Sequence, residues 1–241
     1  MAASSRDTVV VSVLGTLADG VVGAFGSTGL ITVDAAGIEI DWWIGADDGW
    51  RIPSSGAVHT VRPGVAPAAE GRVRVPGGEV VLRAYAVAGE HAPLVVVDVE
   101  NASAAAVVLA WVVRAAPGYR IGRVAIEGST LLVDDRARVA LPRAPLRWAV
   151  DARAVGVHDA VVGGDAASGR FDPAVAARRA GRRGDLEVAV LFPVAHRTRT
   201  RIAASSLAGD PVTVARLPTL ADVERGWVAA LDRGMRVDLP D

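Results

Sequence analysis

The densest group of chemically capable side chains lies in residues 41–51. This stretch holds three of the six tryptophans together with aspartates and an arginine, and its members are Asp41, Trp42, Trp43, Asp47, Asp48, Trp50 and Arg51. Tryptophan faces stack on sugar rings, and carboxylates and guanidinium groups bond to sugar hydroxyls. The set therefore predicts a surface that contacts carbohydrate or an adjoining domain.

Packing inside the protein is the competing interpretation of the same tryptophans. If residues 42 and 43 lie on a strand, Trp42 and Trp43 point to opposite sides of its sheet and cannot share one core. One of the two rings then covers a second surface, which belongs either to another element of the chain or to a partner.

Arginines form two further groups. Arg197, Arg199 and Arg201 alternate along a predicted strand and so share one face, which is either solvated or docked on an acidic partner. A short helix is expected to begin at Asp172 within a long loop, 156–184. A short basic helix of this kind is more often a solvated face than a site for phosphate or an acidic partner. The basic residues concerned are Arg178, Arg179, Arg182 and Arg183.

Neither the carboxylates nor the histidines have the spacing of a catalytic or metal site. Glycosidases need two carboxyl groups about 5–9.5 Å apart across a cleft, whereas adjacent aspartates such as Asp47-Asp48 and Asp134-Asp135 are typical of turns. The four histidines are isolated from one another, at His59, His91, His158 and His196. We therefore predict no catalytic residue and no metal ligand in this chain.

The composition removes several other chemistries. The 241 residues include no cysteine, which excludes thiolate nucleophiles, disulfides and cysteine-ligated metals. All 26 basic residues are arginine, which excludes Schiff-base lysines and the lysine of a phosphate-binding loop. A net charge of −1 favours neither nucleic acid nor an acidic membrane as partner. No cofactor is predicted.

Short, valine-rich apolar runs bounded by Gly, Pro, Asp or Asn predict a chain built of strands. Turn residues separate these runs, as in the hairpin sequence VPGGE at Val75–Glu79. The runs Val95–Val97 and Val107–Val113 are apolar on both faces and are expected at the centre of their sheets. The pattern indicates an all-β fold, an antiparallel β-sandwich (supersandwich-like) over residues 1–215.

An amphipathic helix is predicted after the sandwich. Thr219 and Asp222 have the spacing of a capping box, and Gly234 is a C-terminal stop. The residues between them present one apolar face, formed by Leu220, Val223, Trp227 and Leu231. Residues 216–241 are therefore predicted to be a C-terminal linker helix and tail, with Trp227 as a partner contact.

No membrane segment is predicted. Residues 8–25 are interrupted by Asp19 and several glycines, so they do not form the apolar part of a signal peptide. No apolar run reaches about 18 uncharged residues, the length of a membrane-spanning helix. We expect a cytoplasmic protein, and the absence of cysteine agrees with that location.

Several segments resemble one known family. They are Gly26–Asp34 (GSTGLITVD), Ile40–Gly45 (IDWWIG), the strand Val95–Asn101 ending in Glu-Asn, Pro193–His196, Gly226-Trp227 and Leu239–Asp241. Together they resemble the N-terminal β-sandwich domain of bacterial six-hairpin glycosidase-like proteins. In that family a linker helix follows the sandwich and leads into a helical (α/α)₆ toroid, which carries the catalytic acid and base.

The resemblance implies an accessory role. This sequence ends at Asp241, where such a protein would continue into its toroid, so no catalytic residue is carried over. We expect a non-catalytic accessory domain of a carbohydrate-active protein, which shapes or covers a sugar cleft or packs on the helical domain.

Two alternatives stay open. One is a mutarotase-like sugar epimerase, which needs a histidine acid and a carboxylate base at one cleft. The other is a plain protein-interaction module that uses the arginine face.

Overall fold

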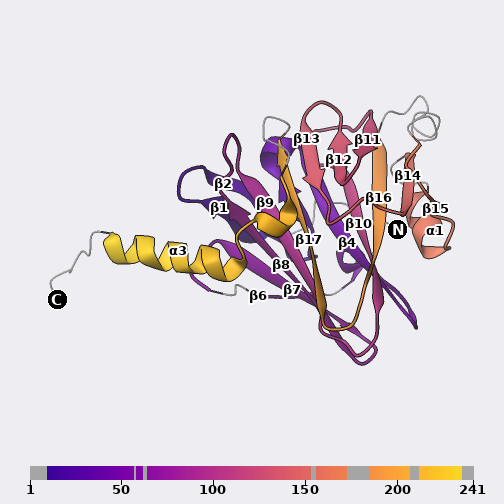
Figure 1. The fold of residues 1–241 in the computed structure, drawn as a ribbon, viewed down its shortest axis with the longest axis horizontal. Helices are drawn as coiled ribbons and strands as arrows, with labels where there is room; N and C mark the ends of the chain where they lie inside the picture. The colour runs from indigo at the N-terminus through magenta and orange to yellow at the C-terminus, as the bar shows by residue number, and fades with distance from the viewer. Residues whose placement is uncertain are drawn as a thin grey trace.

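The fold is that of an all-β sandwich, as predicted. A computed structural model describes residues 10–56, 58–61, 64–152, 156–172, 185–206 and 212–234. In that part of the chain two antiparallel sheets lie face to face, with few helices (Figure 1).

Sheet A has nine strands within the described residues. Their order is β1-β2-β3-β4-β10-β16-β14-β15, and β5 pairs with β4. The strands are β1 (Val10–Thr16), β2 (Gly20–Gly26), β3 (Ile31–Val33), β4 (Ile38–Ala46), β5 (Gly49–Arg51), β10 (Val107–Ala115), β14 (Arg147–Ala152), β15 (Ala167–Ser168) and β16 (Leu186–Val194).

Sheet B has eight strands within the same described residues, in the order β11-β12-β13-β17-β9-β8-β7-β6. The strands are β6 (His59–Val61), β7 (Ala68–Val75), β8 (Gly78–Val87), β9 (Leu94–Asn101), β11 (Val124–Glu127), β12 (Thr130–Val133), β13 (Ala137–Ala140) and β17 (Thr198–Ser206). The predicted central strands are confirmed, since β9 and β10 each pair with strands on both sides.

The main core lies between the two sheets. Alternation along β4 and β10 brings Trp42 and Trp111 into this core at directly opposite positions, and both rings are fully buried. The turn at Pro76-Gly77 joins β7 to β8 as predicted, and Gly77 adopts a φ of +74°, which glycine takes without strain.

Each outer face carries a smaller apolar layer. On sheet A the layer includes Trp43 and is covered by the short helix α1 (Val157–Val162). On sheet B the layer includes Tyr85 and packs against residues just before and within α3 (Leu220–Arg233). The sandwich therefore has a third, partial layer on both sides.

The C-terminal helix is confirmed with its predicted ends. The Thr219 side chain accepts a hydrogen bond from the Asp222 N–H, the Asp222 carboxylate accepts one from the Thr219 N–H, and Gly234 follows the last turn.

The short helix α1 was not predicted, and it begins the stretch that was expected to be a loop. The helix expected from Asp172 falls on residues 173–184, outside the described part of the chain. No helix among the described residues is long and apolar enough to cross a membrane.

Candidate functional site

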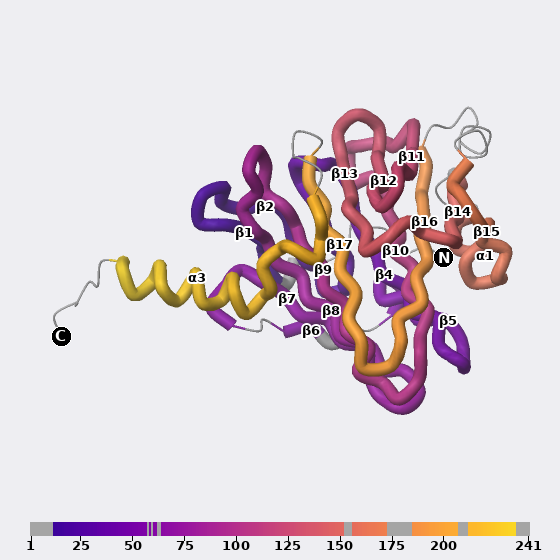
Figure 2. The backbone as a smooth tube through the Cα atoms, in the orientation of Figure 1, coloured from indigo at the N-terminus to yellow at the C-terminus, as the bar shows by residue number. Residues whose placement is uncertain are grey.

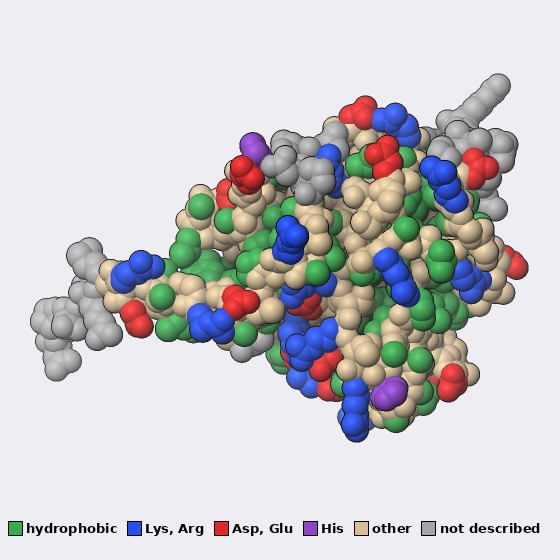
Figure 3. Space-filling view, in the orientation of Figure 1, with side chains coloured by type: hydrophobic (Ala, Val, Ile, Leu, Met, Phe, Trp, Pro, Cys, Tyr) green, Lys and Arg blue, Asp and Glu red, His purple; other side chains and the backbone are tan. Residues whose placement is uncertain are grey.

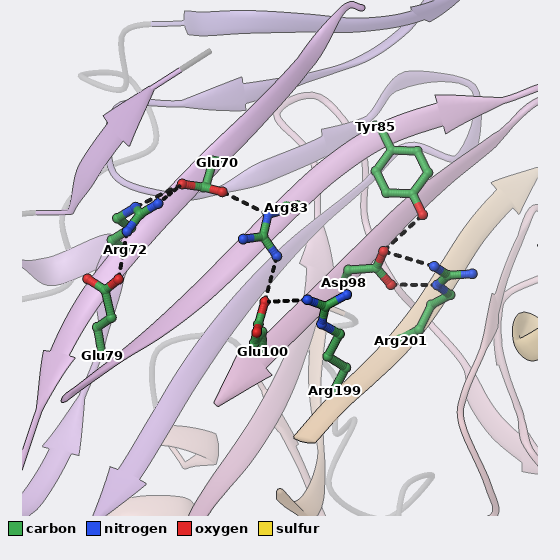
Figure 4. Close-up of polar contacts among 9 residues, drawn as sticks. All are labelled: Glu70, Arg72, Glu79, Arg83, Tyr85, Asp98, Glu100, Arg199 and Arg201. Carbon is green, nitrogen blue, oxygen red and sulfur yellow. Dashed lines mark hydrogen bonds and ion pairs between the residues drawn. The ribbon is translucent and has the colours of Figure 1, made fainter. Parts of the chain in front are cut away.

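The outer face of sheet B carries an extended polar network. Four residues of alternating charge stand opposite one another on adjacent strands, namely Glu70 on β7, Arg83 on β8, Asp98 on β9 and Arg201 on β17. A second row with Glu100 and Arg199 runs beside them (Figure 4). Opposite charges directly across antiparallel strands contribute roughly 0.2–1 kcal/mol per pair, so the network supports the sheet as well as shaping its surface.

Arg83 connects the two rows. Its Nε donates to Glu70 Oε2 at 2.7 Å, and its Nη1 donates to Glu100 Oε2 at 2.9 Å. Arg199 Nη2 lies 3.1 Å from the same Glu100 oxygen. These hydrogen bonds, first that from Arg83 and then that from Arg199, hold the pKa of Glu100 below its usual range. Glu100 therefore stays ionised, bridging two guanidinium groups.

Arg201 and Asp98 clamp the segment that leads into α3. Arg201 donates Nε and Nη2 to the two Asp98 oxygens and Nη1 to the Leu217 carbonyl at 2.8 Å. The Tyr85 hydroxyl lies 2.9 Å from Asp98 Oδ2 and 3.0 Å from the Pro218 carbonyl oxygen. Burial, followed by the Asp98 charge, raises the pKa of Tyr85 far above its usual range, so the hydroxyl remains a donor. Charge-assisted bonds from the sheet thus fix the entry to α3.

The first turns of α3 are anchored to the sandwich. Glu224 accepts hydrogen bonds from the backbone N–H groups of Val65 at 3.1 Å and Ala66 at 3.3 Å. Leu220 and Val223 pack on the apolar layer of sheet B. Beyond these residues the helix extends away from the sandwich (Figure 2).

The distal half of α3 carries apolar side chains that the described residues leave accessible. Val228 is 45% exposed and Leu231 is 58% exposed. Trp227 lies one turn before Leu231 on the same side of the helix and is half-buried. Hydrophobic side chains gather in the angle between α3 and the sandwich (Figure 3). The predicted apolar face thus exists, but only its first turns are covered by the sandwich.

A groove of about 810 Å³ lies between the entry to α3 and the charged rows of sheet B. Its charged side is formed by Arg83, Asp98, Arg199 and Arg201, and Leu217 and Leu220 contribute to its apolar side. Basic and acidic side chains interleave on this part of the surface (Figure 3). The groove and the distal half of α3 form one candidate interaction surface.

The predicted carbohydrate surface is not assembled as expected, because its two leading tryptophans are buried. Trp42 is fully buried between the sheets and donates Nε1–H to the Gly29 carbonyl oxygen at 3.0 Å. Trp43 is 4% exposed on the opposite face of sheet A, where its ring contacts His158 of α1. The opposite orientation of the two rings is confirmed. The second surface belongs to the chain itself, so contact of Trp42 and Trp43 with sugar or a partner was a wrong prediction.

The other members of that group form the β4–β5 hairpin. Asp47 and Asp48 are its turn, as predicted for adjacent aspartates, and Asp48 pairs with Arg51 at the surface. Trp50 is half-buried, and its ring lies across Gly45 so closely that a Cβ there would approach it to 3.0 Å. These residues flank one strand end and do not line the groove beside α3.

Sequence analysis missed the role of Asp41. This carboxylate is fully buried and accepts hydrogen bonds from the Trp42 backbone N–H and the Trp43 Nε1–H, each at 2.9 Å, and from the Ser54 hydroxyl. The bonds tie the loop after β5 to the outer face of sheet A. Two charged residues inside a mostly apolar strand, Glu39 and Asp41, were the available signal, because such a charge is costly unless it is paired.

Arg114 gathers three carboxylates on the same outer face. Its Nε donates to Glu39 at 3.1 Å, and its other nitrogens lie 3.9 Å from Asp41 and 3.8 Å from Glu187. The three acids come from β4 and β16, which flank the strand of Arg114. This cluster is a structural ion network, and no group of three or more His, Asp or Glu among the described residues is placed to hold a metal ion.

The predicted arginine face is only partly correct. Arg197 lies in the β16–β17 turn with a φ of +54° and is not part of the strand. Arg199 and Arg201 do share the outer face of β17, where each meets a carboxylate of β9. The arginines from 178 to 183 lie outside the described residues.

Asp134 and Asp135 form a turn, as predicted, and no histidine is found among the described residues that line the groove. His158 lies 3.0 Å from Asp159, but both side chains are exposed on α1.

Comparison with models of known protein families finds no match for this chain. No match is found among curated proteins either.

Proposed function

We propose that this chain is a non-catalytic β-sandwich module that packs against a helical domain through α3 and the groove beside it. The proposal rests on the exposed apolar side chains in the distal half of α3. Val228 and Leu231 are exposed at 45% and 58%, while the start of the same helix is held by the clamp of Arg201 and Asp98. A rigidly mounted helix with an uncovered apolar side is suited to docking.

The spacing of the apolar residues specifies the partner. Trp227 and Leu231 are four residues apart and Val228 lies beside them, which forms a ridge one side chain wide. Such a ridge fits the groove between two packed helices, as in helix-in-groove recognition. We therefore propose a helical surface with an apolar groove as the occupant.

The role of this module in a carbohydrate-active protein is part of the proposal and rests on the family resemblance. The burial of Trp42 and Trp43 favours the packing version over direct sugar contact. A mutarotase-like epimerase is the weaker alternative, because the groove brings together carboxylates and arginines without a histidine among the described lining residues. A cytoplasmic location also belongs to this proposal, and the cysteine-free composition supports it.

The experiment is site-specific photo-crosslinking in cells of the source organism. A benzophenone amino acid replaces Leu231 in the full chain, and a second version carries it in place of Leu146, which is 70% exposed and directly precedes β14. Strand β14 lies on the side of the sandwich away from α3 (Figure 1). The proposal expects an adduct from position 231 alone, with the cross-linked peptide in a helix of one defined partner. An absence of adducts at 231, equal labelling from both positions, or adducts in unrelated proteins would overturn it.

A further inference from the structure

Among these paired charges at the groove beside α3, Arg199 is much more exposed than the others, while Arg83 and Arg201 are about as buried as the carboxylates that they bond. The Arg199 side chain is 70% exposed, whereas those of Glu100 and Asp98 are 26% and 16% exposed. Both carboxylates lie on β9, directly across from the arginines of β17 that bond to them. An incoming group therefore meets the Arg199 guanidinium before it meets the carboxylates of Glu100 and Asp98.

Arg199 also has donors to spare. Within the described residues its guanidinium group contacts one oxygen, Oε2 of Glu100 at 3.1 Å, and Arg83 already donates to that oxygen. Arg201, by contrast, uses Nε and Nη2 on Asp98 and Nη1 on the Leu217 carbonyl. A guanidinium group has five N–H donors in a planar fork that matches a carboxylate. Arg199 is thus free to take a carboxylate from outside.

The apolar side of the groove indicates which kind of molecule brings that carboxylate. Leu217 and Leu220 line the groove, and Leu220 also begins the apolar face of α3 that continues to Leu231. A ligand that fills the groove and follows α3 must present a carboxylate next to aliphatic side chains over about 16 Å, the rise of the helix between residues 220 and 231. A protein helix has this chemistry and reach.

We propose that the groove binds an acidic side chain of the helical partner, with Arg199 as its anchor. This inference rests on the proposed function and adds the partner's chemistry to it. Glu224 also lines the groove, but its oxygens accept hydrogen bonds from the N–H groups of Val65 and Ala66, which offsets its charge. The helical surface of the partner therefore includes a helix whose aliphatic side chains are flanked by Glu or Asp.

The test uses a blocked helical peptide with leucines at i, i+4 spacing and flanking glutamates, titrated into the full chain at low salt. The resonance of the Arg199 Nε–H group is followed by NMR. We expect this resonance to shift, and Arg199→Gln to weaken binding about tenfold, the loss of one charge-assisted contact. Arg74→Gln is the matched control, since Arg74 is exposed on the same face outside the groove lining, and we expect it to bind the peptide like the unchanged chain.

Three results would overturn the inference. The first is equal binding of a peptide in which glutamine replaces every glutamate. The second is equal weakening by Arg199→Gln and Arg74→Gln, which would indicate only a long-range charge effect. The third is binding of oligogalacturonate, an acidic sugar, at the same resonance but not of the peptide. If the cross-linked partner is lost on Leu231→Glu but kept on Arg199→Gln, the docking function stands and this inference fails.

Discussion

The outer faces of the two sheets carry similar residue types, but the charged side chains are buried on sheet A and border an accessible groove on sheet B. On sheet A, Glu39 and Asp41 are buried; Arg114 bonds to Glu39, and Trp43 and the loop after β5 bond to Asp41. On sheet B the equivalent charges of β8, β9 and β17 remain at the edge of a groove, and only the apolar half of the face is covered. Strand alternation places side chains on an outer face, but what packs on that face decides whether they are structural or accessible.

The largest expected effect is on the free energy of unfolding, and it distinguishes Trp42 in the main core from Trp227 on α3. Trp42→Ala removes a fully buried ring of the main core and is expected to lower the free energy of unfolding by about 3–5 kcal/mol, measured by urea denaturation. Trp227→Ala on the projecting part of α3 is the control and is expected to cost less than about 1 kcal/mol. Similar costs for both variants would contradict the division between core and projecting helix.

Asp41→Ala tests whether the covered face of sheet A depends on its buried carboxylate. The change leaves the Trp42 N–H and the Trp43 Nε1–H without their acceptor, so we expect a loss of about 3 kcal/mol in unfolding free energy. Asp48→Ala in the exposed β4–β5 turn is the matched control and should leave the unfolding midpoint unchanged. A stable Asp41→Ala protein with native spectra would refute the structural role of this acid.

Arg201→Met tests the clamp on sheet B. Asp98 would lose its bidentate partner and the Leu217 carbonyl its donor, which we expect to cost about 2 kcal/mol because the pair is partly exposed. Hydrogen exchange should accelerate in residues 214–224 and stay unchanged in β10. Arg199→Met is the comparison variant, and equal exchange in both proteins would show that Arg201 does not hold α3.

The smallest effect concerns acid stability. Because the folded-state pKa of Glu100 is lowered, its contribution is present above the usual glutamate pKa of about 4.3 and is lost as the pH falls through the lowered folded value. Denaturation midpoints measured from pH 6 downwards should therefore fall less steeply for Glu100→Gln than for the unchanged chain. Parallel curves below pH 4.3 would argue against the bridge to Arg83 and Arg199.

The sequence was sufficient for the fold and for α3. Short valine-rich runs with turn residues gave both sheets, and Thr219, Asp222 and Gly234 marked the helix ends, because these signals are local. The groove was not predictable in the same way. It depends on the pairing of Arg83, Asp98 and Arg201 from three separate strands, and their register follows from tertiary contacts.

Residues 41–51 show a different error, because a contact surface was predicted there and its two leading tryptophans are buried. Its residue types suggested sugar contact, and alternation correctly separated Trp42 from Trp43, yet local sequence gave no measure of burial. The cover over Trp43 comes from α1, more than 100 residues away in the chain. Buried and accessible tryptophans look alike in a sequence, since both positions demand a large apolar ring.

We propose the distal half of α3 as the docking element of this protein. The most direct test is the affinity of the helical partner captured at position 231 for the unchanged chain and for Leu231→Glu, measured by titration calorimetry at equal folded concentration. We predict at least about tenfold weaker binding for Leu231→Glu, with an unchanged melting temperature because the side chain is 58% exposed. Equal affinity of both proteins would contradict the account.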